Sequence, residues 1–294
     1  MKKTKLPFRD LRAINDKEII FFINNILKKK NLFKILNNSK IHDTFLKEYF
    51  EWINSSKLNK LYNLKKFKQK CFSNGSSQSL DYFYLKHNKR RLRFFKNDYI
   101  YHYLSSRNNK IDWKYLENEN LKINKNDAVL ISMPFSDTGS KHPNMEKIIK
   151  ECDIKNVPVL IDCCYYSMCK GINFDFNHRS IESVVFSLSK AFPVSRLRIG
   201  MRLTKVDDDD QLFYYKKLQF VNKLSLYIGL EIIKKFKFDY LYKKYSKLQK
   251  FYCKKMSITP SNVVAIALGG DKWRSYNRGG TKNRICLSSL LEKK

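Results

Sequence analysis

The sequence lacks any apolar run long enough to cross a bilayer. The stretch IIFFINNIL at residues 19–27 is too short for a transmembrane helix. No apolar segment follows the basic start at residues 1–16, as a secretory signal peptide would require. We therefore expect a cytoplasmic protein with no membrane partner.

Cysteine patterns typical of disulfides or metal sites are also missing. The seven cysteines are an odd number, which fits a reducing compartment better than a set of disulfide bonds. Cys163, Cys164 and Cys169 lie close together, but no Cys-x-x-Cys pair or matching histidine pattern accompanies them. The sequence therefore predicts no metal site.

Acidic residues are scarce, since 27 Asp and Glu stand against 59 Lys and Arg and leave a net charge of +32. A basic patch of this strength would favour nucleic acid or an anionic membrane as partner. The lysines are instead spread from Lys2 to Lys294 among many Asn, Ile, Phe and Tyr, a mixture that AT-rich coding also produces. We expect nucleic acid to bind only through nonspecific, salt-sensitive charge.

Short apolar runs alternate with amphipathic segments in the middle of the chain. Hydrophobic residues make up 43% of the sequence, which excludes a disordered chain. Three-to-four spacing predicts helices within residues 1–65, whereas runs at 127–135, 157–164, 180–189 and 196–205 predict buried strands. The alternation predicts an α/β fold with a mostly parallel sheet and helices on both faces.

The character of the sequence changes after residue 206. Four aspartates at 207–210 suit a helix N-terminus, and residues 211–236 predict one long helix. Short strands are expected within 262–270 and 283–291. We expect three parts: an N-terminal helical segment, 1–65, that packs with the small domain; a large domain, 66–206, that holds the site; and 207–294, a connecting helix with a small α+β domain.

Chemically active residues follow the predicted strands. Asp162 follows the run VPVLI, Lys190 follows VVFSLS, and Arg198 lies eight residues further on, on the next predicted strand. The turn SNGSSQ at 73–78 opens a helix whose free amides suit a phosphate. Ligands of wound α/β sheets bind beyond the carboxyl ends of the strands. A carboxylate, a lysine and a phosphate turn at one sheet edge suit pyridoxal phosphate, which needs all three.

Each of these residues has a structural alternative when taken singly. Asp162 could be a turn or cap residue, and residues 75–77 could be an ordinary helix N-cap. Lys190 could be a surface lysine whose stem packs on apolar side chains. The order and spacing of the features together favour the cofactor site.

Four motifs occur in a fixed order: SNGSSQSLD at 73–81, VLIDCCYYS at 159–167, SLSKAFPVSRLRIG at 187–200 and NRICLS at 283–288. They resemble the phosphate turn, the Asp-x-x-Tyr segment, the lysine segment ending in Arg-Ile-Gly, and the carboxylate-binding arginine strand of one family. That family is the fold-type I pyridoxal-phosphate enzymes of the class I/II aminotransferase kind. The resemblance runs from about residue 70 onward and implies a large domain like that of the pyridoxal-phosphate-dependent transferases.

The resemblance implies catalytic roles for three residues. Lys190 would form the Schiff base with pyridoxal phosphate and then move the Cα proton of the substrate. Asp162 would keep the pyridine nitrogen protonated, and Tyr165 would hydrogen-bond the phenolic oxygen of the ring. A lysine held as an unprotonated imine carries no charge, which explains its tolerance at the end of an apolar run.

The resemblance also implies the groups that surround the cofactor and the substrate. Arg284 would bind the substrate carboxylate, with Arg274 and Arg278 as alternatives. Either Ser136 or Asp137 stands where the family has the asparagine of an Asn-Pro-x-Gly turn at the ring oxygen. The other expected cofactor-binding residues are Ser76, Ser77, Gln78, Ser187, Ser189 and Arg198 at the phosphate, and Tyr99 stacked on the ring.

Together the implied roles predict an aminotransferase that moves an amino group between an amino acid and a 2-oxo acid, working as a homodimer. Two alternatives stay open. One is a decarboxylase or lyase that uses the same cofactor on an amino-acid substrate. The other is a catalytically reduced, basic binding protein on the same scaffold.

Overall fold

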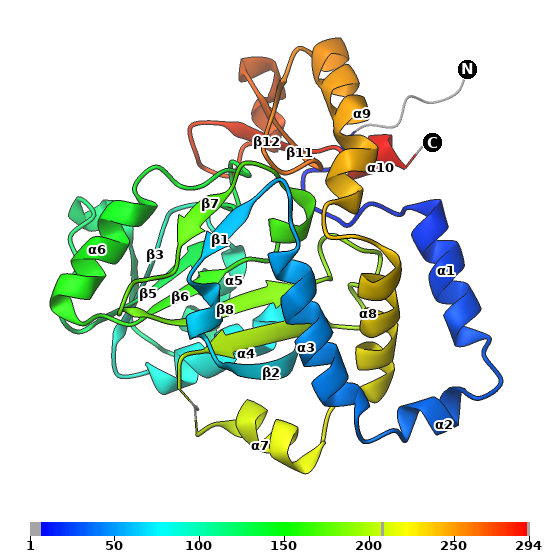
Figure 1. The fold of residues 1–294 in the computed structure, drawn as a ribbon. Coiled ribbons are helices and arrows are strands. Elements are labelled where there is room, and N and C mark those ends of the chain that lie inside the picture. Colours follow the sequence, from blue (N-terminus) through cyan, green and yellow to red (C-terminus); the bar gives the residue numbers. More distant parts are fainter. Residues whose placement is uncertain (1–6, 207–208, 293–294) are drawn as a thin grey trace.

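The computed structural model describes residues 7–206 and 209–292 (Figure 1). Its helices are α1 (Lys17–Leu27), α2 (Leu32–Leu36), α3 (Ile41–Asn54), α4 (Gly75–Lys86), α5 (Ile100–Asn108), α6 (Met145–Lys155), α7 (Gln211–Leu218), α8 (Lys223–Lys235), α9 (Tyr240–Met256) and α10 (Ser288–Leu291). Its strands are β1 (Lys60–Tyr62), β2 (Gln69–Asn74), β3 (Arg91–Phe94), β4 (Trp113–Tyr115), β5 (Asp127–Ser132), β6 (Val159–Asp162), β7 (Asn173–Asp175), β8 (Ile181–Ser187), β9 (Ile199–Thr204), β10 (Thr259–Pro260), β11 (Ile266–Gly269) and β12 (Asn283–Cys286).

The central sheet has seven strands in the order β2-β9-β8-β6-β5-β3-β4. Strand β9 pairs antiparallel with both of its neighbours, and the other pairings are parallel. This arrangement confirms the predicted α/β class with a mostly parallel sheet.

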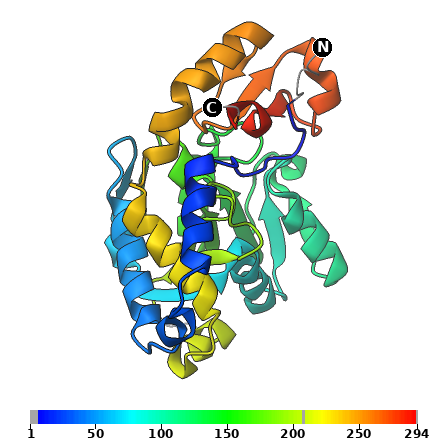
Figure 2. The same ribbon diagram turned by 90° about the vertical axis from the view of Figure 1, so that its right-hand side faces the viewer.

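Both faces of the sheet are covered by helices, as Figures 1 and 2 show. Along β5 every residue is buried, and its successive side chains join two different hydrophobic clusters. Val129 and Ile131 belong to the larger cluster, whereas Ala128 and Leu130 pack with side chains of α4. A strand buried on both faces explains why the apolar runs are continuous rather than alternating.

The register of the parallel strands brings their carboxyl ends to one edge. Ser132, the last residue of β5, lies opposite Asp162, the last residue of β6. Asp162 in turn lies opposite Val185 of β8, two residues before that strand ends at Ser187. The segments that leave these strands therefore start side by side and can build one pocket.

The N-terminal region packs along the large sheet and reaches the C-terminal strands. Helix α3 lies against α8, and the Trp52 indole donates to the Phe236 carbonyl over 2.7 Å. Before α1 the chain is extended, with Phe8 bridged to Cys286 of β12. The Ser288 hydroxyl donates to the Arg12 carbonyl over 2.5 Å. The first described residues are thus held by the last ones.

A second, antiparallel sheet of order β10-β11-β12 lies beside α9 in the C-terminal part of the chain (Figure 1). Gln249 of α9 donates from Nε2 to the carbonyls of Ser261, Val263 and Ile266 over 2.9–3.2 Å. One buried amide therefore fixes the helix to this sheet.

The expected single helix over 211–236 is wrong. Helix α7 ends at Leu218 because Gln219 takes the left-handed conformation, with φ at 58°. Helix α8 starts afresh, with the Asn222 side chain accepting from the Ser225 amide. Asp210 caps α7 by accepting from the next amides, whereas Asp207 and Asp208 lie outside the described residues. No helix in the described ranges combines the length and apolar character that crossing a bilayer requires.

Candidate active site

A pocket of about 590 Å³ opens at the carboxyl edge of the large sheet. Its walls include nine of the residues predicted from the sequence: Ser76, Tyr99, Ser136, Asp162, Tyr165, Ser187, Ser189, Lys190 and Arg198. Three predicted residues, Ser77, Gln78 and Arg284, are not part of its lining.

Asp162 provides an acid at the buried floor of the pocket. Only 4% of the residue is exposed, and its Oδ1 accepts from the Cys164 amide over 3.0 Å. Burial raises the pKa of this carboxyl to about 6, since ionisation is unfavourable away from water. A cationic partner, such as a protonated ring nitrogen, would stabilise the ionised form.

Lys190 leaves β8 and extends into the pocket rather than into the core. Its Nζ lies 5.9 Å from the centre of the Tyr99 ring, within the range of a cation–π contact. Among the described residues no carboxylate forms an ion pair with it. The apolar run before Lys190 is the buried strand, and the amine itself is free to react.

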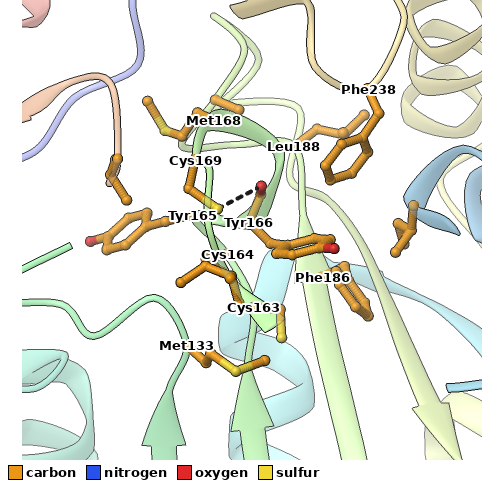
Figure 3. Close-up of a cluster of buried hydrophobic side chains, with 14 of the residues drawn as sticks. Met133, Cys163, Cys164, Tyr165, Tyr166, Met168, Cys169, Phe186, Leu188 and Phe238 are labelled. Carbon is orange, nitrogen blue, oxygen red and sulfur yellow. Dashed lines mark hydrogen bonds between the residues drawn. The ribbon is translucent and has the colours of Figure 1, made fainter. Parts of the chain in front are cut away.

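Two adjacent tyrosines point to opposite sides of the segment after β6 (Figure 3). Tyr166 enters the core, where its ring centre lies 5.1 Å from that of Phe238 and 6.1 Å from that of Phe186. Its carbonyl accepts from the Cys169 thiol over 3.2 Å, which holds the turn. Tyr165 lines the pocket. The segment therefore separates the packing tyrosine from the pocket tyrosine.

The start of α4 and Arg198 form a cradle for an anion. Gly75 has φ at +71°, and a Cβ there would lie 2.4 Å from Nη2 of Arg198. Nη2 donates to the Ser77 hydroxyl over 2.7 Å, so Ser77 contributes through Arg198. Arg198 itself has φ at 54° and lies just before β9, not on the strand. Helix amides and a guanidinium together suit a phosphate.

The hydroxyl groups of Ser187 and Ser189 differ in whether they have hydrogen-bond partners within the described protein. The Ser187 hydroxyl donates to the Ile199 carbonyl over 3.1 Å and accepts from the Ser189 amide over 3.2 Å. The Ser189 hydroxyl is buried and has no partner in the described structure. A buried hydroxyl left unpaired on a pocket wall indicates a missing ligand. Gln78 is already used, because its Oε1 accepts from the Asn74 amide over 2.7 Å.

One wall of the pocket is backed by two arginines. Arg284 donates from Nη1 to the Ser136 carbonyl over 2.8 Å, whereas its Nε is buried without a partner. Arg278 Nη1 lies 3.8 Å from Asp137 Oδ1 and 3.4 Å from the Ser136 hydroxyl. Of the two candidates at this turn, Ser136 lines the pocket and Asp137 faces the arginines.

Sequence reasoning missed the exposed part of the pocket wall. We call this part the rim: the four exposed lining residues, which are Arg12, Asn15, Ser195 and Arg196. Two of them lie in the extended segment before α1, where no periodic pattern indicates a contact with residues far along the chain. Cys164 and Ser132 were also missed, although both lie beside the ends of predicted strands.

The fold and the pocket together define a class, the fold-type I pyridoxal-phosphate enzymes. A family model for aminotransferases of class I and II matches residues 91–237, half of the chain, and the chain belongs to that family. No curated protein matched the chain by sequence.

Solved structures show the same fold over nearly the whole chain. An aminotransferase from Staphylococcus aureus aligns with a TM-score of 0.68 at 13% identity, over 99% of this chain and 92% of that one. A kynurenine aminotransferase from Pyrococcus horikoshii gives 0.67 at 12% identity, over 99% and 89%. A C-S lyase from Staphylococcus hominis gives 0.62 at 14% identity, over 98% and 88%.

Pyridoxal phosphate is the cofactor that the family and the pocket support. Three observations fit it: the unpaired Ser189 hydroxyl, the Gly75 cradle that a Cβ would fill, and the buried acid at Asp162.

Proposed function

We propose that the chain is a pyridoxal-phosphate-dependent aminotransferase that moves an amino group between an amino acid and a 2-oxo acid. The observation that carries the proposal is the convergence of Asp162, Lys190 and Arg198 on one pocket. When bound, the cofactor supplies an electrophilic carbon for an amine and a ring that withdraws electrons. The tasks left to the protein are to hold this group, to orient the substrate and to move protons.

Lys190 would bind the aldehyde carbon of the cofactor through Nζ and, once released, would move a proton at the substrate Cα. Its unpaired position beside Tyr99 leaves it available for both tasks. Asp162 would hold a proton on the pyridine nitrogen, since a cation there offsets the unfavourable burial of its charge. Tyr165 and Ser136 would donate to the ring oxygen, and Tyr99 would stack on the ring.

The phosphate would lie against the start of α4. Ser76 and Ser189 would hydrogen-bond it, and Arg198, oriented by Ser77, would supply the charge. Ser187 would act through its hydrogen bond to the Ser189 amide. The predicted phosphate contact of Gln78 has no support in this arrangement, because the amide is turned to Asn74.

Arg284 would bind the α-carboxylate of the substrate. Its Nη1 holds the Ser136 carbonyl, and its buried Nε has no partner among the described residues. A carboxylate prefers two parallel donors of one guanidinium, and Nε belongs to the side that Ser136 leaves open.

The first test is the absorption spectrum of the purified protein after addition of pyridoxal phosphate. The wild type is expected to show a visible band from the lysine-bound cofactor, and Lys190→Ala is expected to lose it. Lys122→Ala, which removes an exposed lysine outside the pocket, should keep the band. No bound cofactor in the wild type would overturn the proposal.

The second test adds single amino acids and follows both the band and the products. Loss of the band with release of the matching 2-oxo acid, one for each site, supports amino-group transfer. Repeated turnover that releases ammonia or carbon dioxide without a 2-oxo acceptor would indicate the lyase or decarboxylase alternative. A band that responds to no amino acid would leave a cofactor-binding protein without this activity.

We further propose a cytoplasmic homodimer. The absence of disulfides among the seven buried cysteines supports a reducing compartment. Ile100, which follows the pocket residue Tyr99, is 58% exposed and would lie at a subunit contact. Light scattering measures the assembly state.

A further inference from the structure

The charges around the pocket are strongly unequal. Its lining holds four cationic side chains, Arg12, Lys190, Arg196 and Arg198, and Asp162 as the acid that the described residues place there. Within the proposed function, Lys190 and Asp162 serve the cofactor, and Arg198 serves its phosphate. The proposed function assigns no role to Arg12 and Arg196 at the rim.

Within residues 7–206 and 209–292, no acidic side chain neutralises either rim arginine. No carboxylate of the described chain forms an ion pair with Arg12 or Arg196. The Arg12 guanidinium lies 4.5 Å from the centre of the Phe8 ring, a contact that keeps its charge.

Asp10, two residues before Arg12, has no ion pair with it among the described residues, and the acidic residues that follow the rim segment have other partners. Asp16 and Glu18, which follow the rim segment, both form ion pairs with Lys244. Glu292 accepts from the Asn15 amide over 3.2 Å and does not line the pocket. The rim therefore presents two guanidinium groups that have no carboxylate partner in the described part of the chain, together with the polar side chains of Asn15 and Ser195.

The segments that carry these arginines are fixed, although the side chains are exposed. The Arg12 carbonyl accepts from Ser288, and Phe8 is paired with Cys286. Arg196 lies two residues before Arg198, whose Nη1 donates to the Ser195 carbonyl over 3.4 Å. Both cations are thus placed at the rim by the backbone of the fold rather than by a loose surface loop.

We infer that the substrate carries a second anionic group on its side chain, a carboxylate or a phosphate monoester, and that Arg12 and Arg196 bind it. This inference rests on the proposed function. The α-carboxylate would lie on the side of the pocket where Arg284 backs the Ser136 wall, and the side-chain anion would lie at the rim. Guanidinium groups bind either anion through paired hydrogen bonds.

The test compares amino acids that match in shape but differ in charge. The cofactor-loaded enzyme is assayed for kcat/KM with glutamate against glutamine, aspartate against asparagine, and O-phosphoserine against serine. The charged member of at least one pair is expected to be favoured by about 10-fold or more, as for a charge-assisted hydrogen bond. The pair with the largest ratio identifies the anion as carboxylate or phosphate.

Variants then assign the preference to the rim. Arg196→Gln and Arg12→Gln should each lower kcat/KM for the charged member by about 10–100-fold and change the neutral member by less than about 3-fold. Arg107→Gln is the matched control, because it removes an exposed arginine at the end of α5, away from the pocket. Arg196→Lys keeps the charge and covers the case in which Arg196→Gln does not fold.

Each outcome decides one point. Equal or better use of the neutral members overturns the inference but leaves the aminotransferase proposal intact. Equal loss for charged and neutral members in both rim variants also overturns it, since the arginines would then be structural. A cofactor band that no amino acid changes overturns the proposed function, and this inference with it.

Discussion

The floor of the pocket and its rim are built from different kinds of structure. The floor residue Asp162 ends β6 and Ser189 lies two residues after β8, both buried strands of the mostly parallel sheet, and both residues are nearly excluded from water. The rim residues Arg12 and Arg196 lie in exposed segments without regular structure. The difference indicates that the sheet fixes the floor of the pocket, whereas the connecting segments form its more exposed part, where sequence can vary with less effect on the fold.

The floor of the pocket contains a carboxyl group, that of Asp162, whose ionisation is unfavourable because it is buried. The rim contains no such group. The pKa of Asp162 is raised from 3.8 to about 6, so the folded protein without cofactor binds this proton more tightly than the unfolded chain does. The free energy of unfolding of the cofactor-free protein therefore falls as pH rises from about 4 through about 6. Above that window the ionised carboxylate destabilises the fold by about 3 kcal/mol.

Asp162→Asn should give the largest effect. It should stabilise the cofactor-free protein and weaken the binding of the cofactor. Without cofactor, unfolding in urea at pH 7.5 should show a gain of about 3 kcal/mol that disappears near pH 4. The cofactor dissociation constant should rise by about 10–100-fold, because the charged partner of the ring nitrogen is lost.

Asp153→Asn is the control variant, which should change stability in the opposite direction. Hydrogen bonds to Ser180 and His178 lower the pKa of Asp153 against its burial, so its removal should destabilise at neutral pH. A loss of stability in Asp162→Asn at pH 7.5 would contradict this account of the floor.

Gly75→Ala tests the cradle and should be next in size. The left-handed backbone makes a side chain unfavourable by about 1–2 kcal/mol, and the new Cβ would displace the Arg198 guanidinium. Gly171→Ala shares the positive φ, at +72°, but its Cβ would meet only Asn262 at 3.4 Å. Both variants should lose similar stability in thermal unfolding. A cofactor affinity that is equally intact in both would show that the cradle does not bind the phosphate.

Ser187 and Ser189 offer the finest comparison within the floor. Ser187→Ala should lower stability by about 1 kcal/mol, because it removes hydrogen bonds made inside the protein. Ser189→Ala should leave the cofactor-free protein unchanged or slightly more stable and weaken cofactor binding several-fold, because its hydroxyl has no partner in the described residues. Titration with pyridoxal phosphate and urea unfolding separate the two effects. A loss of stability in Ser189→Ala, together with unchanged cofactor binding, would contradict the proposed role of Ser189.

The sequence indicates where the floor residues lie because they are close to strong local signals. Asp162 and Lys190 each follow an apolar run that could only be a buried strand, and the Gly75 turn precedes an amphipathic helix. The reversed direction of β9 has no such signal, because strand direction depends on pairing across the sheet. The break of 211–236 into α7 and α8 was missed because a left-handed Gln219 leaves the apolar spacing nearly unchanged.

The rim could not be predicted from local pattern. Arg12 and Arg196 are 184 residues apart in the sequence, and Arg196 opens the run 196–205, of which the structure makes only Ile199–Thr204 a strand. The place of Arg12 in the pocket wall depends on Phe8 and Arg12 being held by Cys286 and Ser288, contacts that only the folded chain defines. Among so many cations, composition alone gives no reason to single out two.

The hydrogen bonds that join Phe8 to Cys286 and Arg12 to Ser288 also limit the order in which parts of the protein can fold during synthesis. A ribosome makes residues 7–15 first and residues 283–288 almost 280 residues later. Among the strands of the described ranges, the large sheet contains none after β9, so it can form while the rest of the chain is still being synthesised. The rim segment, in contrast, must wait for its partners. During synthesis the floor of the pocket would therefore form before the N-terminal part of its rim is in place.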